Sequence, residues 1–180
     1  MEGLTERSHV RRLSLVAALC VGCSGGSGGS STLTGPDAFP VTYTVVVAVK
    51  TDGGIGTFEA ALADADLSAD FVPAVVCART PVSPSVDARV VSLGIKGVGA
   101  SPPPLVVGTP YPSQSIYLDE LFADGGSVQL AGQGSSTGTI TLTALSTSQV
   151  AGSFNASLTT EDGGVLALGG TFSAAPIVCN

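Results

Sequence analysis

The chain has 180 residues, of which only 12% are charged, with 7 basic and 14 acidic side chains. So few Lys and Arg residues cannot neutralise a phosphate backbone, which excludes nucleic acid as a partner. The single histidine is His9, in a segment that we expect to be removed. The folded part then has no imidazole for a Ser-His-Asp or Cys-His catalytic site, and none to ligate zinc.

Residues 1–22 have the layout of a secretory signal peptide. The basic pair Arg11-Arg12 precedes an apolar run from Leu13 to Gly22, which ends in a small residue before Cys23. This run is too short to cross a bilayer core of about 30 Å, which needs roughly twenty residues. We therefore expect residues 1–22 to be a leader that is cleaved on export.

The residues around Cys23 indicate how the exported chain is held. Val21-Gly22-Cys23, followed by Ser24-Gly25-Gly26, resembles the lipobox of bacterial lipoproteins, although Cys20 stands where that family usually has Leu. The resemblance implies cleavage before Cys23, acylation of its thiol with a fatty chain such as palmitate, and anchoring in the bacterial outer membrane, facing the periplasm or the cell surface. The membrane would then be a partner through the N-terminal lipid. Secretion without a lipid is the alternative.

Residues 23–38 are predicted to form a flexible tether behind the lipid. The stretch from Ser24 to Pro36 is rich in Gly and Ser and has no charge, and such a composition favours a coil. The folded domain is predicted to cover residues 39–180, a length typical of one domain.

Alternation of apolar and polar residues predicts many strands within this domain. The clearest is Val41 to Lys50, where Val and Tyr alternate with Thr and Ala. Further strands are expected at 71–78, 86–95, 115–118, 127–131, 139–144, 150–158 and 166–174. Residues 58–67 fit two turns of helix or a strand that enters a loop. Residues 101–112 contain five prolines and are expected to form an extended surface connection.

Asp-Gly-Gly occurs at 52–54, 124–126 and 162–164, each time between two expected strands, which favours tight hairpin turns. Short strands that place apolar residues on one face and hydroxyls on the other are typical of an antiparallel sheet with one buried face. The predicted fold is all-β, an antiparallel β-sandwich behind the signal peptide and the Gly/Ser tether.

The C-terminal third carries a repeated pattern, Gly152-Ser153-Phe154-Asn155-Ala156 and Gly170-Thr171-Phe172-Ser173-Ala174. From about Gly132 onward, the chain resembles small bacterial lipoproteins of unassigned function, in which such a hairpin repeats and a terminal cysteine closes the domain. Residues 54–60, followed by Phe71-Val72-Pro73 and Cys77, look like the first half of cohesin-type sandwich modules. Neither resemblance implies a catalytic residue.

Two cysteines remain after cleavage and acylation, Cys77 and Cys179, and in an oxidising compartment they are expected to form a structural disulfide. Asp64, Asp66 and Asp70 are the densest group of carboxylates. If a loop wrapped them around one ion they would bind calcium, but a solvated acidic loop is the favoured interpretation. No cofactor is expected.

Two functions of different class remain open. The favoured one is a non-catalytic envelope lipoprotein whose sandwich has a structural role or binds a protein or glycan ligand. The alternative is an exported hydrolase that uses carboxylates alone, for which Asp119 and Glu120 are candidates. Because adjacent residues on a strand point to opposite faces, this pair does not form a glycosidase site by itself.

Overall fold

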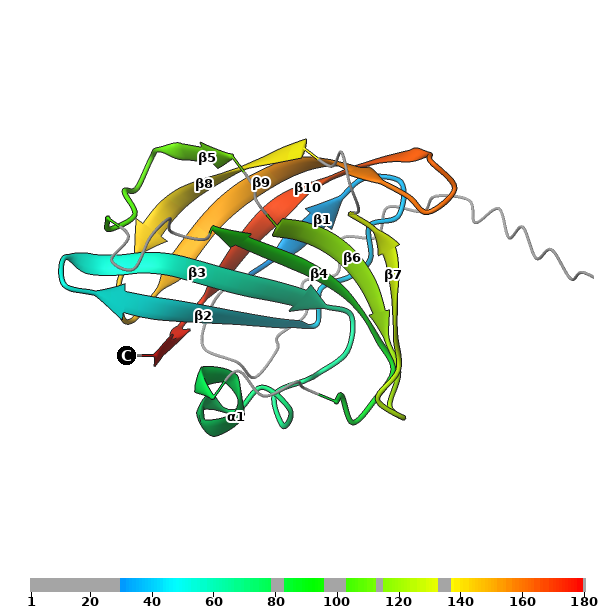
Figure 1. Cartoon of the computed structure of the whole chain (residues 1–180), viewed down its shortest axis with the longest axis horizontal. Coiled ribbons are helices and arrows are strands. Elements are labelled where there is room, and N and C mark those ends of the chain that lie inside the picture. The colour runs from blue at the N-terminus through cyan, green and yellow to red at the C-terminus, as the bar shows by residue number, and fades with distance from the viewer. Residues whose placement is uncertain (1–29, 79–82, 96–102, 113–114, 133–136, 180) are drawn as a thin grey trace, which may run out of the picture.

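A computed structural model describes residues 30–78, 83–95, 103–112, 115–132 and 137–179. Over these residues the chain folds into two β-sheets packed face to face, which confirms the predicted all-β sandwich (Figure 1). One short helix, α1 (Pro73–Cys77), lies outside the sheets.

In the described part, one sheet has five strands, all of them antiparallel to their neighbours. Its strands are, in spatial order, β1 (Thr32–Thr34), β10 (Val165–Ala174), β9 (Val150–Thr159), β8 (Thr137–Leu145) and β5 (Pro110–Pro112). We call it the C-terminal sheet, because its long strands come from the last third of the chain.

The second sheet has six strands in the described part and is here called the N-terminal sheet. Its strands are, in spatial order, β11 (Pro176–Cys179), β2 (Tyr43–Thr51), β3 (Gly54–Ala63), β4 (Ala88–Ile95), β6 (Ser115–Leu121) and β7 (Ser127–Ala131). All neighbours are antiparallel except β11, which returns from the other sheet and runs parallel to β2.

The main core lies between the sheets and is built from the alternating apolar residues that the sequence marks. Phe58 of β3 stacks on Phe172 of β10 with ring centroids 5.6 Å apart, and both rings are buried. Phe154 and Leu142 add large side chains from the C-terminal sheet. No polar or charged residue is among the buried residues of the described part, so the interior is held by apolar packing.

A second, smaller apolar cluster consists of Ala63, Leu67, Ala88 and Val90. Ala63 and Val90 are cross-strand partners on β3 and β4, while Leu67 comes from the loop that follows β3 and is completely buried. That loop therefore covers part of the outer face of the N-terminal sheet.

The Asp-Gly-Gly prediction is confirmed at all three places. The turns join β2 to β3, β6 to β7 and β9 to β10. Gly125 and Gly163 have φ angles of 89° and 80°, which a residue with a Cβ adopts only at a cost. Their N–H groups donate to Phe122 O and Thr160 O, and these bonds close the turns.

Three local predictions need correction or a choice. Residues 71–78 were expected to form a strand, but Pro73–Cys77 form α1, with Pro73 at the start of the helix where its missing N–H costs nothing. Residues 58–67 follow the strand-and-loop alternative, since β3 continues to Ala63. Thr32–Thr34 were expected in the flexible tether, but they form β1 on the edge of the C-terminal sheet, so the ordered domain begins before Phe39.

Candidate functional site

The predicted lipid acceptor, Cys23, and the whole predicted leader lie outside the described residues. Within the described ranges, no helix is long and apolar enough to cross a membrane. The anchor therefore remains a prediction from the sequence.

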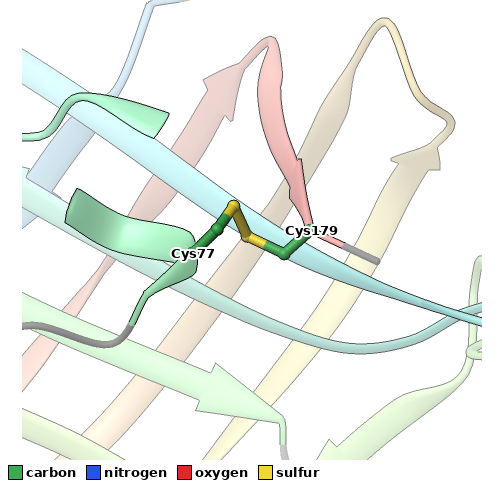
Figure 2. The surroundings of a disulfide bond; sticks show 2 residues. All are labelled: Cys77 and Cys179. Atoms are coloured by element: carbon green, nitrogen blue, oxygen red, sulfur yellow. A yellow bond between two sulfur atoms is a disulfide. The ribbon is translucent and has the colours of Figure 1, made fainter. Parts of the chain in front are cut away.

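Cys77 and Cys179 form the predicted disulfide (Figure 2). Their Cα atoms lie 5.4 Å apart although 102 residues separate them in the chain. Cys77 is the last residue of α1 and Cys179 is the last residue of β11, so the bond fastens the helix to the end of the edge strand. The pairing confirms what the cysteine count predicts.

The disulfide attaches α1 covalently to the sandwich. No residue of α1 is buried, so the helix gains little from apolar packing. The strand that it holds, β11, has only four residues, and none of them is fully buried. Covalent closure of a loop of about 100 residues restricts the unfolded chain strongly, which compensates for this weak packing.

Asp64, Asp66 and Asp70 do not converge on one point; each carboxylate fixes a different part of the loop after β3. Asp64 Oδ1 accepts the backbone N–H of Arg89 at 2.8 Å, and its Oδ2 lies 2.9 Å from Arg89 Nε. Asp70 Oδ2 accepts both the N–H and the hydroxyl of Ser85. Within the described ranges, no group of three or more His, Cys, Asp or Glu side chains is placed to hold a metal ion.

The third carboxylate, Asp66, closes a turn within the loop itself. It accepts the N–H of Ser68 at 2.9 Å, and this hydrogen bond lowers the pKa of Asp66. Leu67, between these two residues, is the completely buried side chain of the smaller cluster. The aspartates thus anchor the loop that covers the outer face of the N-terminal sheet.

Arg89 joins this loop to the main core. Its guanidinium lies 4.9 Å from the centroid of the buried Phe39 ring while its Nε pairs with Asp64. A cation over an aromatic face is attracted by the ring quadrupole. One basic side chain therefore links the segment before β2, β4 and the loop after β3.

Asp119 is the one acidic side chain of the described residues whose pKa is raised. It lies on β6 opposite Val90 of β4 and Gln129 of β7. Burial raises the pKa of the Asp119 carboxyl above its usual range. The Nε2 atom of Gln129 is also buried and has no hydrogen-bond partner within the described part of the chain. The two groups form a polar spot on the N-terminal sheet that sequence reasoning did not single out as a pair.

The strand register separates Asp119 from Glu59, a carboxylate-bearing residue on the same face of the N-terminal sheet. Glu59 of β3 pairs with Gly94 of β4, which pairs with Ser115 of β6. Asp119 lies four residues farther along β6 than Ser115, so standard strand spacings put the two carboxylate-bearing residues about 16 Å apart. The paired carboxylates of glycosidases lie only about 5–10 Å apart.

The connection between the two sheets carries a further surface feature, in a segment that the sequence predicts only to be extended. Residues 103–109 pass from the N-terminal sheet to the C-terminal sheet and expose two adjacent valines, Val106 and Val107, at 57% and 48%. The phenol of Tyr111 accepts the N–H of Val106 at 2.7 Å. Alternation patterns do not predict this feature, because the segment has no regular secondary structure before β5.

Comparisons of the chain with protein-family models, with curated proteins and with solved structures found no match. A function is therefore inferred only from the residues of this chain and the geometry described above.

Proposed function

We propose that the protein is a bacterial envelope lipoprotein, cleaved before Cys23, acylated on that cysteine and held at the outer membrane, with its β-sandwich as a non-catalytic structural or binding module. The observation that carries the proposal is the run Leu13 to Cys23 behind Arg11-Arg12. An apolar stretch of this length that ends in a small residue is the layout of an export signal, and the cysteine that follows resembles the acceptor of a lipobox.

The disulfide between Cys77 and Cys179 supports export. Disulfides form and persist in oxidising compartments such as the periplasm and the cell surface, and they are rare where glutathione keeps thiols reduced. The bond fastens two weakly packed elements, α1 and β11, so it has a structural role in the described domain.

The distribution of carboxylates supports a non-catalytic domain. Asp64, Asp66 and Asp70 all have hydrogen-bond partners that fix the loop after β3. Asp119 and Glu59 are too far apart for glycosidase chemistry. The alternative, an exported hydrolase that uses carboxylates alone, would need a second acid closer to Asp119 than Glu59 is.

The test of the proposal compares two cysteine variants in cells fed a labelled fatty acid. Wild type and Cys20→Ala should both incorporate the label and sediment with membranes, because Cys20 is removed with the leader. Cys23→Ala should lose the label and leave the membrane fraction. Equal labelling of Cys23→Ala and wild type would overturn the proposal.

A further inference from the structure

The connection between the two sheets presents an apolar tip, which we define as residues 103–109 and call the valine tip. The segment before β5 lies at the same end of the sandwich as the β2–β3 turn (Figure 1). Val106 and Val107 of this segment are exposed, and Pro104 lies next to Gly53 of that turn. The β9–β10 turn lies at the opposite end. Isolated exposed apolar side chains are ordinary on protein surfaces, whereas these two valines are adjacent and form one small apolar patch.

Hydrogen bonds from both sheets hold the tip. Leu105 N–H donates to Ile55 O of β3, and Gly108 N–H donates to Leu142 O of β8, each at 2.8 Å. Thr109 N–H donates to Val106 O, and Gly108 has a φ of 81°, as the third residue of a type II turn requires. Val107 is thereby placed at the apex.

The backbone of the tip is suited to an environment without water. Four of the five residues from Leu105 to Thr109 donate their N–H groups within the protein, Val106 to the phenol of Tyr111. Pro103 and Pro104 have no N–H to satisfy. Unpaired backbone groups are the main cost of moving a segment into an apolar or interfacial medium. Few N–H donors of the tip would be left without a partner there.

The tip is also free of charge on an acidic protein. Residues 23–180 contain twelve acidic and four basic side chains, yet no charged residue occurs between Lys96 and Asp119. An anionic lipid surface repels clustered carboxylates. The tip itself adds no carboxylate to this repulsion, and the nearest acid in the sequence of the adjoining β2–β3 turn is the exposed Asp52.

We propose that the valine tip is a second contact with the membrane, inserting Val106 and Val107 among the headgroups of the leaflet that holds the acyl chain on Cys23. This inference rests on the proposed function, because the tip alone offers two small side chains. Tethering to the same leaflet raises the effective concentration of the tip at that surface.

The chain between anchor and domain is long enough for both contacts. Seven residues from Cys23 to Ser30 span up to about 25 Å when extended. The C-terminal sheet is four strand spacings wide between β1, where the tether enters, and β5, next to the tip, which amounts to about 19 Å. One leaflet can therefore hold the lipid on Cys23 and contact the tip at the same time.

The test uses the absence of tryptophan from the chain to introduce a single reporter. Val107→Trp and, as a second position, Val106→Trp are made in the full chain and purified with their lipid. The matched control is Val165→Trp, at another valine of the described part, 73% exposed, at the β9–β10 turn. Each is reconstituted into phosphatidylcholine vesicles with brominated acyl chains, and its emission is compared with that in unbrominated vesicles.

The proposal predicts that bromine at least halves the emission of Val107→Trp and Val106→Trp and leaves that of Val165→Trp unchanged. If the protein floats with the vesicles but bromine changes the emission of none of the three variants, the inference is overturned and the anchor stays in place. Equal quenching of all three would also overturn it, because the contact would not be specific to the tip. Protein that neither floats nor carries the acyl mass would overturn the proposed function and this inference with it.

Discussion

Gly152 of β9 lies directly opposite Phe172 of β10, and the phenyl ring occupies the space beside the glycine. A Cβ at position 152 would come within 2.8 Å of Phe172 Cζ and 2.6 Å of Thr141 O. The register repeats this relationship in reverse, since Gly170 pairs with Phe154. The two copies of the Gly-Ser/Thr-Phe pattern therefore face each other, each glycine making room for the phenylalanine of the other copy.

Gly152→Ala is expected to destabilise the domain by about 2 kcal/mol, because a Cβ forced into a filled core shifts the ring and the neighbouring strand. Denaturant unfolding of the purified variant measures the loss. Phe172→Leu in the same background should recover part of it, which a double-mutant cycle detects.

Gly163→Ala is the control for this variant. Gly163 lies in a turn with a φ of 80°, and among the described residues, its chain neighbours apart, nothing comes within 4 Å of the place a Cβ would take. The cost of the substitution, about 1 kcal/mol, therefore comes from the backbone alone. Phe172→Leu should not reduce that cost. Equal coupling of both glycines to Phe172 would contradict the packing account.

Removal of the disulfide is expected to cost about 4 kcal/mol, because the loop between Cys77 and Cys179 spans 102 residues. The double variant Cys77→Ser/Cys179→Ser should show this loss in denaturant unfolding. Wild type in a reducing buffer should unfold at the same denaturant concentration as the double variant, and reductant should not change the double variant. A wild type insensitive to reductant, with its thiols shown to be free, would contradict the structural role of the bond.

Asp64→Ala is expected to reduce stability by about 1 kcal/mol, a modest loss because the pair with Arg89 is partly exposed to solvent. The side chain accepts bonds from the backbone and the guanidinium of Arg89, which joins the loop to β4. Asp66→Ala removes only the local bond to Ser68 and should cost less. Denaturant unfolding checks both, and a larger loss for Asp66→Ala would show that the link to Arg89 is not what holds the loop.

Asp119 should make the domain less stable as pH rises. Burial raises its pKa in the folded state above the value in the unfolded chain, so the folded state holds the proton more tightly. The free energy of unfolding contributed by this group is therefore highest below the unfolded pKa and falls as pH rises through the interval up to the folded pKa. Asp119→Asn should gain stability over wild type at pH 7 and little at pH 3.

Asp162 is the comparison for Asp119, because the stability that it contributes changes with pH in the opposite direction. The hydroxyl of Thr160 and the N–H of Gly164 donate to its carboxylate and lower its pKa, so its contribution is lost as pH falls. Asp162→Asn should therefore lose stability relative to wild type at pH 7 and lose less at pH 3. Parallel pH profiles for the Asp119 and Asp162 variants would contradict the assignment.

The long strands could be predicted from the sequence because their apolar period matches their burial. In β9, Val150, Phe154 and Leu158 are buried as the alternation requires, and Leu166, Leu168 and Phe172 repeat this on β10. The alternation therefore predicts which face of each strand is buried, because a shift of one residue would turn the apolar side chains to the other face.

The short elements could not be predicted this way. β1, β5 and β11 have three or four residues, too few to show a period, and they form only by pairing with strands distant in the chain. Val75 and Val76 favour a strand by propensity, yet this segment is helical. Pro73 is the first residue of the helix, and the disulfide holds its last residue. The valine tip was missed for the same reason, since its hydrogen bonds come from Ile55 and Leu142.

The mass of the N-terminal peptide of the protein purified from its own cells tests the central claim most directly. The account predicts a chain that begins at Cys23 and carries the added mass of fatty acyl groups on that residue. A chain that begins at Met1, or one that begins at Cys23 without acyl mass, would contradict it.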